Sequence, residues 1–313
     1  MILAIETSCD ETCASVVGAD LHILSNVTNT QIDIHKLYGG VVPEIASRNH
    51  AMNILGVVEE ALSRAKITKS DLTAIAATTH PGLRGCVMVG AVFGESAAAA
   101  LKIPFIPVNH LAAHIASISL SGAFPPAPPL RRPNESNFPF LCLLVSGGHT
   151  ALYHVKSWDN IHLLTQTIDD AVGEAFDKVG KILGLEYPAG PKIETLALQN
   201  TAPLITFVKN NKCKQFTYSG LKTSVLHYKD KTNIPNICAS FQHEAVSQLV
   251  TRTREWQRKL GVNTVCVCGG VSANKYLRAQ LPDAIFPPFE YCTDNAAMVG
   301  AAAILGVKIV DEK

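Results

Sequence analysis

The feature that most constrains the fold is a pattern that occurs twice along the chain. Residues 2–5 form a short apolar run that leads through a polar turn into alternating residues at 13–17. The same order of apolar run, polar turn and second strand returns at 140–155. Short apolar runs and alternation indicate β-strands, and this spacing is far longer than a solenoid period. We therefore predict two copies of one lobe.

Helical periodicity after the first strands completes an α/β plan in each half. The first half is followed by a segment so rich in proline that it is typical of a linker. We predict a first lobe at 1–120, a linker at 121–137 and a second lobe at 138–313, whose last helix could pack back on the first lobe. The predicted fold class is α/β with two duplicated lobes.

Turns rich in Gly, Ser and Thr follow the predicted strands at 6–12, 146–150 and 269–274. Such turns present backbone N–H groups to phosphate oxygens, and two facing lobes would form a cleft for a ligand. The sequence therefore predicts a bound nucleotide. The turn at 269–274 also fits an ordinary connection from strand to helix, because Gly-Gly turns are common in α/β proteins.

His110 and His114 are four residues apart in a small-residue segment, so a helix would place both rings on one face. With Asp294 they would offer two nitrogens and one carboxylate to a divalent ion. The alternatives are two half-buried histidines without a metal and an aspartate that caps the helix 295–305. A zinc protease is excluded, because the general-base glutamate of His-Glu-x-x-His is missing between the histidines.

The composition is that of a globular protein with ample material for packed cores, at 47% hydrophobic residues in 313. Its 27 basic and 26 acidic residues nearly cancel, so charge neither proves nor excludes an RNA substrate. Nine cysteines without Cys-x-x-Cys spacing predict reduced core residues. No basic leader and no apolar run of membrane-spanning length is recognised, which predicts a cytoplasm-like compartment and no membrane.

Nine segments in a fixed order closely resemble the TsaD family of tRNA adenosine threonylcarbamoyltransferases, formerly called O-sialoglycoprotein endopeptidases (Gcp). The resemblance covers essentially the whole chain and favours the bacterial and organellar branch. One segment is the histidine pair, and the others are 5–12 (IETSCDET), 40–50 (GVVPEIASRNH), 81–85 (PGLRG), 144–150 (LVSGGHT), 169–178 (DDAVGEAFDK), 218–222 (YSGLK), 269–274 (GGVSAN) and 293–297 (TDNAA).

The resemblance implies a two-lobed fold of the actin, sugar kinase and Hsp70 (ASKHA) superclass. It implies transfer of threonylcarbamoyl from threonylcarbamoyl-AMP to the N6 amine of the adenosine next to the tRNA anticodon, with AMP released. It also implies that His110, His114 and Asp294 bind one iron or zinc ion, which assists the acyl transfer without a protein nucleophile. An adenine nucleotide such as ATP would fit the same place as the adenylate.

The resemblance further implies a substrate site. Its predicted residues are the acyl-phosphate loop Leu144, Val145, Ser146, Gly147 and Gly148, and the nucleoside contacts Asp177, Gly190 and Asn274. Read alone, Asp177 could instead cap a helix or pair with neighbouring lysines. Ala189 departs from the family, which usually has glycine there, so the turn must avoid a positive φ at this residue or accept strain.

The family implies three partners: tRNA, an inactive paralogous subunit of the same fold (TsaB-like), and a small P-loop ATPase (TsaE-like). The absence of a leader favours the bacterial cytoplasm over the mitochondrial matrix. Two other functions stay open from the residues alone. An actin-like nucleotide-dependent switch fits the glycine turns, and a small-molecule kinase could use Asp10 or Asp177 as base, but neither explains the histidine pair.

Overall fold

The computed structural model describes residues 1–122, 137–207 and 213–310, so nearly all of the predicted linker 121–137 lies outside the described residues. The chain divides into two compact units. The first consists of Met1–Phe138, Lys156–Ile161 and Pro287–Val310, and the second contains Pro139–Val155 and His162–Phe286. The carboxyl-terminal segment, which contains the last helix, belongs to the first unit.

The first unit is built on a five-stranded mixed sheet with the order β3-β2-β1-β4-β5. A meander of three antiparallel strands is extended by two strands that run parallel to β1. The strands are β1 (Ile2–Glu6), β2 (Glu11–Val17), β3 (Ile23–Thr30), β4 (Ala74–His80) and β5 (Phe105–Asn109).

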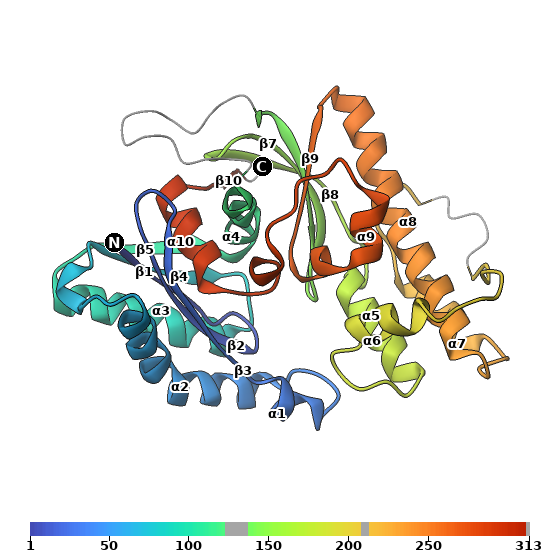
Figure 1. Ribbon diagram of the computed structural model, residues 1–313, viewed down its shortest axis with the longest axis horizontal. Coiled ribbons are helices and arrows are strands. Elements are labelled where there is room, and N and C mark those ends of the chain that lie inside the picture. The colour runs from blue at the N-terminus through green and yellow to red at the C-terminus, as the bar shows by residue number, and fades with distance from the viewer. Residues whose placement is uncertain (123–136, 208–212, 311–313) are drawn as a thin grey trace. The chain divides into compact units, whose positions relative to one another are not determined.

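Helices cover both faces of this sheet (Figure 1). Successive side chains of a strand point to opposite faces, so Leu3 and Ile5 pack with α2 and α3, whereas Ala4 packs with α4 and α10. The helices are α1 (Ile32–Lys36), α2 (Pro43–Arg64), α3 (Arg84–Leu101), α4 (His110–Ala116) and α10 (Ala296–Leu305), with short 3-10 turns at Lys69–Asp71, Ser117–Ser121 and Phe289–Tyr291.

Helix α10 explains why the carboxyl-terminal segment joins the first unit. Its residues 296–302 are all buried, and a Cβ added at Gly300 would lie 2.5 Å from Cγ2 of Val17 on β2. Only glycine permits this close approach of helix to sheet. The helix therefore packs as a core element of the sheet formed by the first 109 residues.

The second unit repeats the plan of the first. Its strands have the order β8-β7-β6-β9, in which β6 pairs antiparallel with β7 and parallel with β9, as β1 does with β2 and β4. These strands are β6 (Phe140–Val145), β7 (Thr150–Ser157), β8 (Asn160–Gln166) and β9 (Thr264–Cys268). The short strand β10 (Ile309–Val310) belongs to the first unit. The predicted duplication of an α/β lobe is confirmed.

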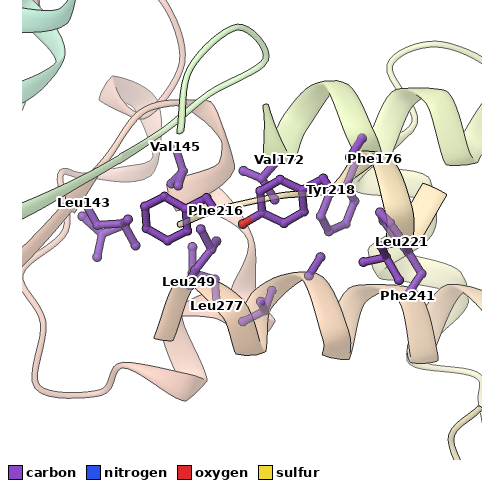
Figure 2. Close-up of a cluster of buried hydrophobic side chains, with 14 of the residues drawn as sticks. Leu143, Val145, Val172, Phe176, Phe216, Tyr218, Leu221, Phe241, Leu249 and Leu277 are labelled. Atoms are coloured by element: carbon purple, nitrogen blue, oxygen red, sulfur yellow. The ribbon is translucent and has the colours of Figure 1, made fainter. Parts of the chain in front are cut away.

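Large side chains from β6, α5 and α8 make the core of this unit (Figure 2). Phe176 and Phe241 meet edge to face, with ring centroids 4.9 Å apart. The helices are α5 (Val172–Ile182), α6 (Gly190–Ala197), α7 (Ser219–His227), α8 (Ile234–Leu260) and α9 (Lys275–Gln280), and Gly270–Ala273 forms a 3-10 turn. All nine cysteines are free, and seven of them are buried.

Helix α3 corrects one expectation about apolar runs. Its 18 residues have a mean hydropathy of 1.3 and are long and apolar enough to cross a membrane by length and composition alone. In the structure the helix packs on the first sheet. Its glycines lie close to the sheet: Gly90 lies against Thr7, and Gly94 lies against Phe105 and Ala77. Helix α3 therefore serves as a covering helix of the sheet.

The contact of Gly180 with Ala189 yields a stability prediction. Ala189 has φ −90°, so the turn before α6 avoids a positive φ. A Cβ added at Gly180 would lie 2.1 Å from the Cβ of Ala189. We expect Gly180→Ala to lower the free energy of unfolding by about 1–3 kcal/mol, as overpacking does. Urea denaturation should show that Gly180→Ala combined with Ala189→Gly recovers most of this loss; no recovery would contradict the contact.

Candidate metal centre

The two predicted metal histidines lie on α4: His110 is its first residue, and His114 lies about one turn later. Asn109 ends β5 and caps the helix, because its side chain accepts hydrogen bonds from the N–H groups of Leu111 and Ala112 at 2.8 and 3.0 Å. The helix therefore starts at His110, and His114 lies one turn later on the same face. The two ring centroids are 4.6 Å apart at an interplanar angle of 76°.

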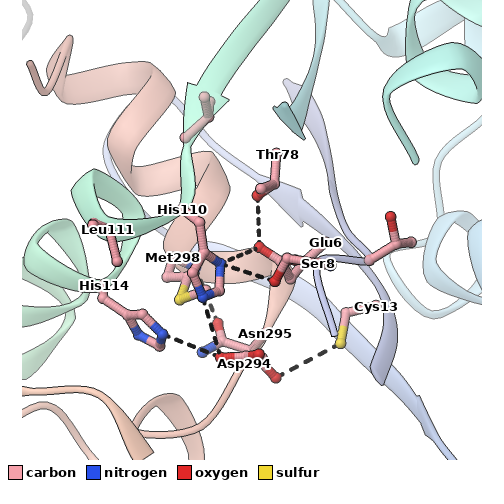
Figure 3. A network of polar contacts seen from close by, with 12 residues as sticks. Glu6, Ser8, Cys13, Thr78, His110, Leu111, His114, Asp294, Asn295 and Met298 are labelled. Atoms are coloured by element: carbon pink, nitrogen blue, oxygen red, sulfur yellow. Dashed lines mark hydrogen bonds and ion pairs between the residues drawn. The ribbon is translucent and has the colours of Figure 1, made fainter. Parts of the chain in front are cut away.

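Asp294 reaches both histidines from the segment before α10 (Figure 3). Its Oδ1 lies 3.1 Å from Nε2 of His114 and 3.7 Å from Nε2 of His110. One ligand atom from each of the three residues falls within 4.8 Å of the others. The structure thus brings together three residues that are predicted from distant parts of the sequence.

The alternative role of Asp294 as a helix cap is not what the structure shows. The cap of α10 is Asn295, whose side chain accepts the N–H of Met298 at 3.0 Å, and the helix begins at Ala296. The Asp294 carboxylate stands one residue before the cap, and its side chain is 21% exposed. The carboxylate is therefore directed at the histidines while its neighbour satisfies the helix end.

The donor set fits a metal ion. His114 is fully buried, and although its Nε2 lies 3.1 Å from Oδ1 of Asp294, neither of its ring nitrogens forms a hydrogen bond with the described residues. A buried polar atom left in this way costs about 1–3 kcal/mol, which a ligand on Nε2 would offset. Two imidazole nitrogens and one carboxylate suit iron or zinc and leave a coordination position for substrate.

His110 is held from its other side by a carboxylate that sequence reasoning did not identify. Its Nδ1 lies 3.0 Å from Oε2 of Glu6, the last residue of β1, and 3.1 Å from Oγ of Ser8. Burial disfavours the protonated, charged form of His110 and so lowers its pKa. The neighbouring carboxylates Glu6 and Asp294 outweigh this effect and raise the pKa of His110 to about 9. Burial also opposes the ionised Glu6, but His110 holds the pKa of this carboxyl below its ordinary value.

The Glu11 carboxyl, at the start of β2, is influenced by the charges of Asp10 and Asp294. Burial raises the pKa of Glu11 well above its ordinary value, and the neighbouring Asp10 and Asp294 raise it further. The ionised form of Glu11 is therefore disfavoured by its surroundings. A divalent ion would relieve this mutual repulsion, because opposite charge favours the ionised forms.

The predicted acyl-phosphate loop lies in the second unit. Leu144 and Val145 are buried at the end of β6, and the loop closes where the N–H of Ser146 donates to the carbonyl of His149 at 2.8 Å. Gly147 and Gly148 face open space, since a Cβ added at either would meet nothing within 4 Å. Packing does not require glycine at these two positions, so room is left for a ligand to approach the backbone.

The predicted nucleoside residues lie elsewhere in the same unit and have structural contacts. Asp177 accepts the N–H of Ala189 at 2.8 Å, and the neighbouring Lys178 contacts Asp170 and Glu174. Asn274 caps α9 and donates to Gln242 at 3.0 Å. Gly190 begins α6 and, like Gly147, faces open space.

The two duplicated α/β lobes give the chain a two-lobed fold of the ASKHA type. The chain superposes on component A of (R)-2-hydroxyglutaryl-CoA dehydratase from Acidaminococcus fermentans with a TM-score of 0.57 at 13% identity, covering 97% of this chain and 96% of that one. Full-length HypF gives a TM-score of 0.62 at 14% identity, covering 97% of this chain and 46% of that one. These similarities concern the fold.

The family model described as TsaD, tRNA N6-adenosine threonylcarbamoyltransferase, matches residues 22–301. The curated protein of that name from Riemerella anatipestifer is 42% identical over 97% of this chain and 92% of its own length. The one from Kosmotoga olearia is 43% identical over 96% and 92%. The chain belongs to the TsaD family.

Proposed function

We propose that the chain transfers threonylcarbamoyl from threonylcarbamoyl-AMP to the N6 amine of the adenosine 3′ of the anticodon, in tRNAs that read ANN codons. Family membership gives the reaction class, and the relatives are named as transferases. The observation that carries the proposal to this chain is the convergence of His110, His114 and Asp294 within 4.8 Å. Nucleoside mass spectrometry of tRNA after incubation with the chain tests it.

The three residues would hold one divalent iron or zinc ion. When bound, the ion supplies Lewis acidity, which draws charge from an oxygen of the mixed anhydride and so favours attack by a weakly nucleophilic aryl amine. His110 is 6% exposed and His114 is fully buried. Their rings are therefore held in place by packing and exclude water from the side of the site that they form. The geometry requires no serine or cysteine nucleophile.

The second unit would hold the adenylate. Residues 144–148 would bind the acyl phosphate, since glycines at 147 and 148 let the backbone N–H groups approach phosphate oxygens. Asp177, Gly190 and Asn274 would contact the ribose and adenine, with the bond from Ala189 to Asp177 fixing the turn that carries Gly190. ATP or another adenine nucleotide would use the same contacts.

A side chain at Gly148 is expected to weaken adenylate binding. Gly148→Val would place a branched side chain in the open space over the loop, so steady-state kinetics should show KM for threonylcarbamoyl-AMP raised about tenfold or more, with a smaller change in kcat. Gly220 in α7 also faces open space, and Gly220→Val is the matched control. An unchanged KM in the first variant would contradict the assignment of the loop.

The proposed partners are tRNA, an inactive paralogous subunit (TsaB-like) and a P-loop ATPase (TsaE-like), and the proposed location is the bacterial cytoplasm. The bacterial relatives and nine free cysteines support that location. The alternative of an actin-like switch without transferase activity is not favoured, because it leaves the metal-type cluster without a role.

A further inference from the structure

Glu6 is a carboxylate at the end of β1 with no exposed surface. Three groups converge on it: the N–H of Ser8 at 2.5 Å on Oε1, and the hydroxyl of Thr78 at 2.6 Å and Nδ1 of His110 at 3.0 Å on Oε2 (Figure 3). An ionised carboxylate can only accept hydrogen bonds, and a buried charge persists only when it is paired and hydrogen-bonded. Each of the three groups must therefore act as a donor.

This pattern determines which nitrogen of His110 carries the proton. Because Glu6 accepts, the hydrogen must be on Nδ1, and a neutral ring then has its lone pair on Nε2. Nε2 is the atom that lies 3.7 Å from Oδ1 of Asp294. His114 has no such partner, since both of its ring nitrogens lack hydrogen bonds within the described ranges. The two histidines thus differ in how firmly they are prepared for a ligand.

We propose that Glu6 is a positioning residue of the metal centre, which keeps the proton of His110 on Nδ1 and so presents Nε2 to a divalent cation. The inference rests on the proposed metal site. Carboxylate partners of ligating histidines fix the tautomer and ring orientation, and their loss typically costs about 10–100-fold in metal affinity. Thr78 would assist indirectly, because its hydroxyl holds the same oxygen of Glu6.

Glu6→Gln tests this role with almost no change in shape. The amide has one oxygen, and the N–H of Ser8 at 2.5 Å demands an acceptor at the Oε1 position. The NH₂ group would then occupy the Oε2 position and donate towards Nδ1 of His110. The ring would have to place its hydrogen on Nε2, where it blocks the ligand atom. Ser8→Ala is the matched control, because it removes the other group near Nδ1 and leaves Glu6 in place.

The experiment uses the full chain loaded with Zn²⁺ and follows the release of zinc into excess chelator. Release is preferable to affinity, because affinity also includes the deprotonation of His110. We expect release to be about 10–100-fold faster in Glu6→Gln than in wild type, and Ser8→Ala to remain close to wild type. Equal release in Glu6→Gln and wild type would overturn the proposal.

A measurement on the wild-type protein keeps the proposal testable if Glu6→Gln does not fold. In ¹⁵N-labelled, zinc-loaded protein, the imidazole nitrogens of His110 should show a hydrogen on Nδ1 and zinc on Nε2. Zinc on Nδ1, or a hydrogen on Nε2, would overturn the role of Glu6. A wild-type chain that holds no zinc would instead overturn the metal site itself, so the two failures are distinguishable.

Discussion

Asp294→Asn is expected to lose the metal and to lower tRNA modification by roughly a thousandfold. The change removes the only charged ligand of the proposed set and keeps the shape of the side chain. Lewis-acid assistance contributes several kcal/mol to a transition state, and each 1.36 kcal/mol is a factor of ten in rate. Metal analysis of the purified protein and nucleoside mass spectrometry of the tRNA measure the two losses separately.

Asp283→Asn provides the control for this prediction. Asp283 forms an ion pair with Arg254 in the second unit, whereas the three metal residues belong to the first unit. The same chemical change there should leave both the metal content and the modification close to wild type, since surface ion pairs contribute at most about 1 kcal/mol. Full activity of Asp294→Asn, with metal retained, would remove Asp294 from the centre.

Gly269→Ala should destabilise the protein by about 3 kcal/mol. Gly269 has φ +88°, and an added Cβ would lie 2.4 Å from the carbonyl oxygen of Val145. Gly269 has ψ 164°, an extended positive-φ conformation that is adopted almost only by glycine and costs other residues about 1–3 kcal/mol. The clash with backbone that cannot move aside adds about 1–3 kcal/mol. Urea denaturation of the two proteins measures the difference.

Gly261 separates these two contributions. It also has a positive φ, of +65°, at the end of α8, but an added Cβ would meet nothing within 4 Å. Gly261→Ala should therefore cost only the conformational part, about 1–2 kcal/mol. If both variants lost the same stability, the close approach of Gly269 to β6 would not be a constraint on the fold.

The duplicated architecture could be predicted from the sequence because it rests on local patterns. Alternation within the hairpin strands reports which side chains are buried, and the same pattern recurs at the start of β6. The sequence allowed the last helix to pack back on the first lobe, but local patterns did not determine this position. Residues 296–302 of this helix are all buried, so it has no polar face that would indicate its neighbours.

The site shows the same limit of local patterns. The spacing of His110 and His114 indicates a shared helix face, but Asp294 and Asn295 are both common capping residues, and only the structure shows that Asn295 is the cap. Glu6 stood unnoticed in a polar turn, because its partner His110 lies 104 residues away. A charged residue that directly follows the buried strand Ile2–Ile5 is the signal that could have drawn attention to it.

The two Gly-Gly turns show that the same residue type can have different structural roles. Gly147 and Gly148 face open space without positive φ, whereas Gly269 needs glycine for its φ and for its contact with Val145. The ordinary structural explanation of the turn at 269–274 therefore accounts for Gly269. The open space at Gly147 and Gly148 is left for the proposed ligand.

The most direct test of metal-dependent threonylcarbamoyl transfer is nucleoside mass spectrometry of tRNA treated with the metal-stripped wild-type chain. The reaction contains threonylcarbamoyl-AMP, supplied by the enzyme that makes it, and the two proposed partner proteins. We predict little modified adenosine without metal and its recovery when Fe²⁺ or Zn²⁺ is restored. Undiminished modification by the stripped chain would contradict the role of the centre, and no product with metal present and proven partners would contradict the transferase function.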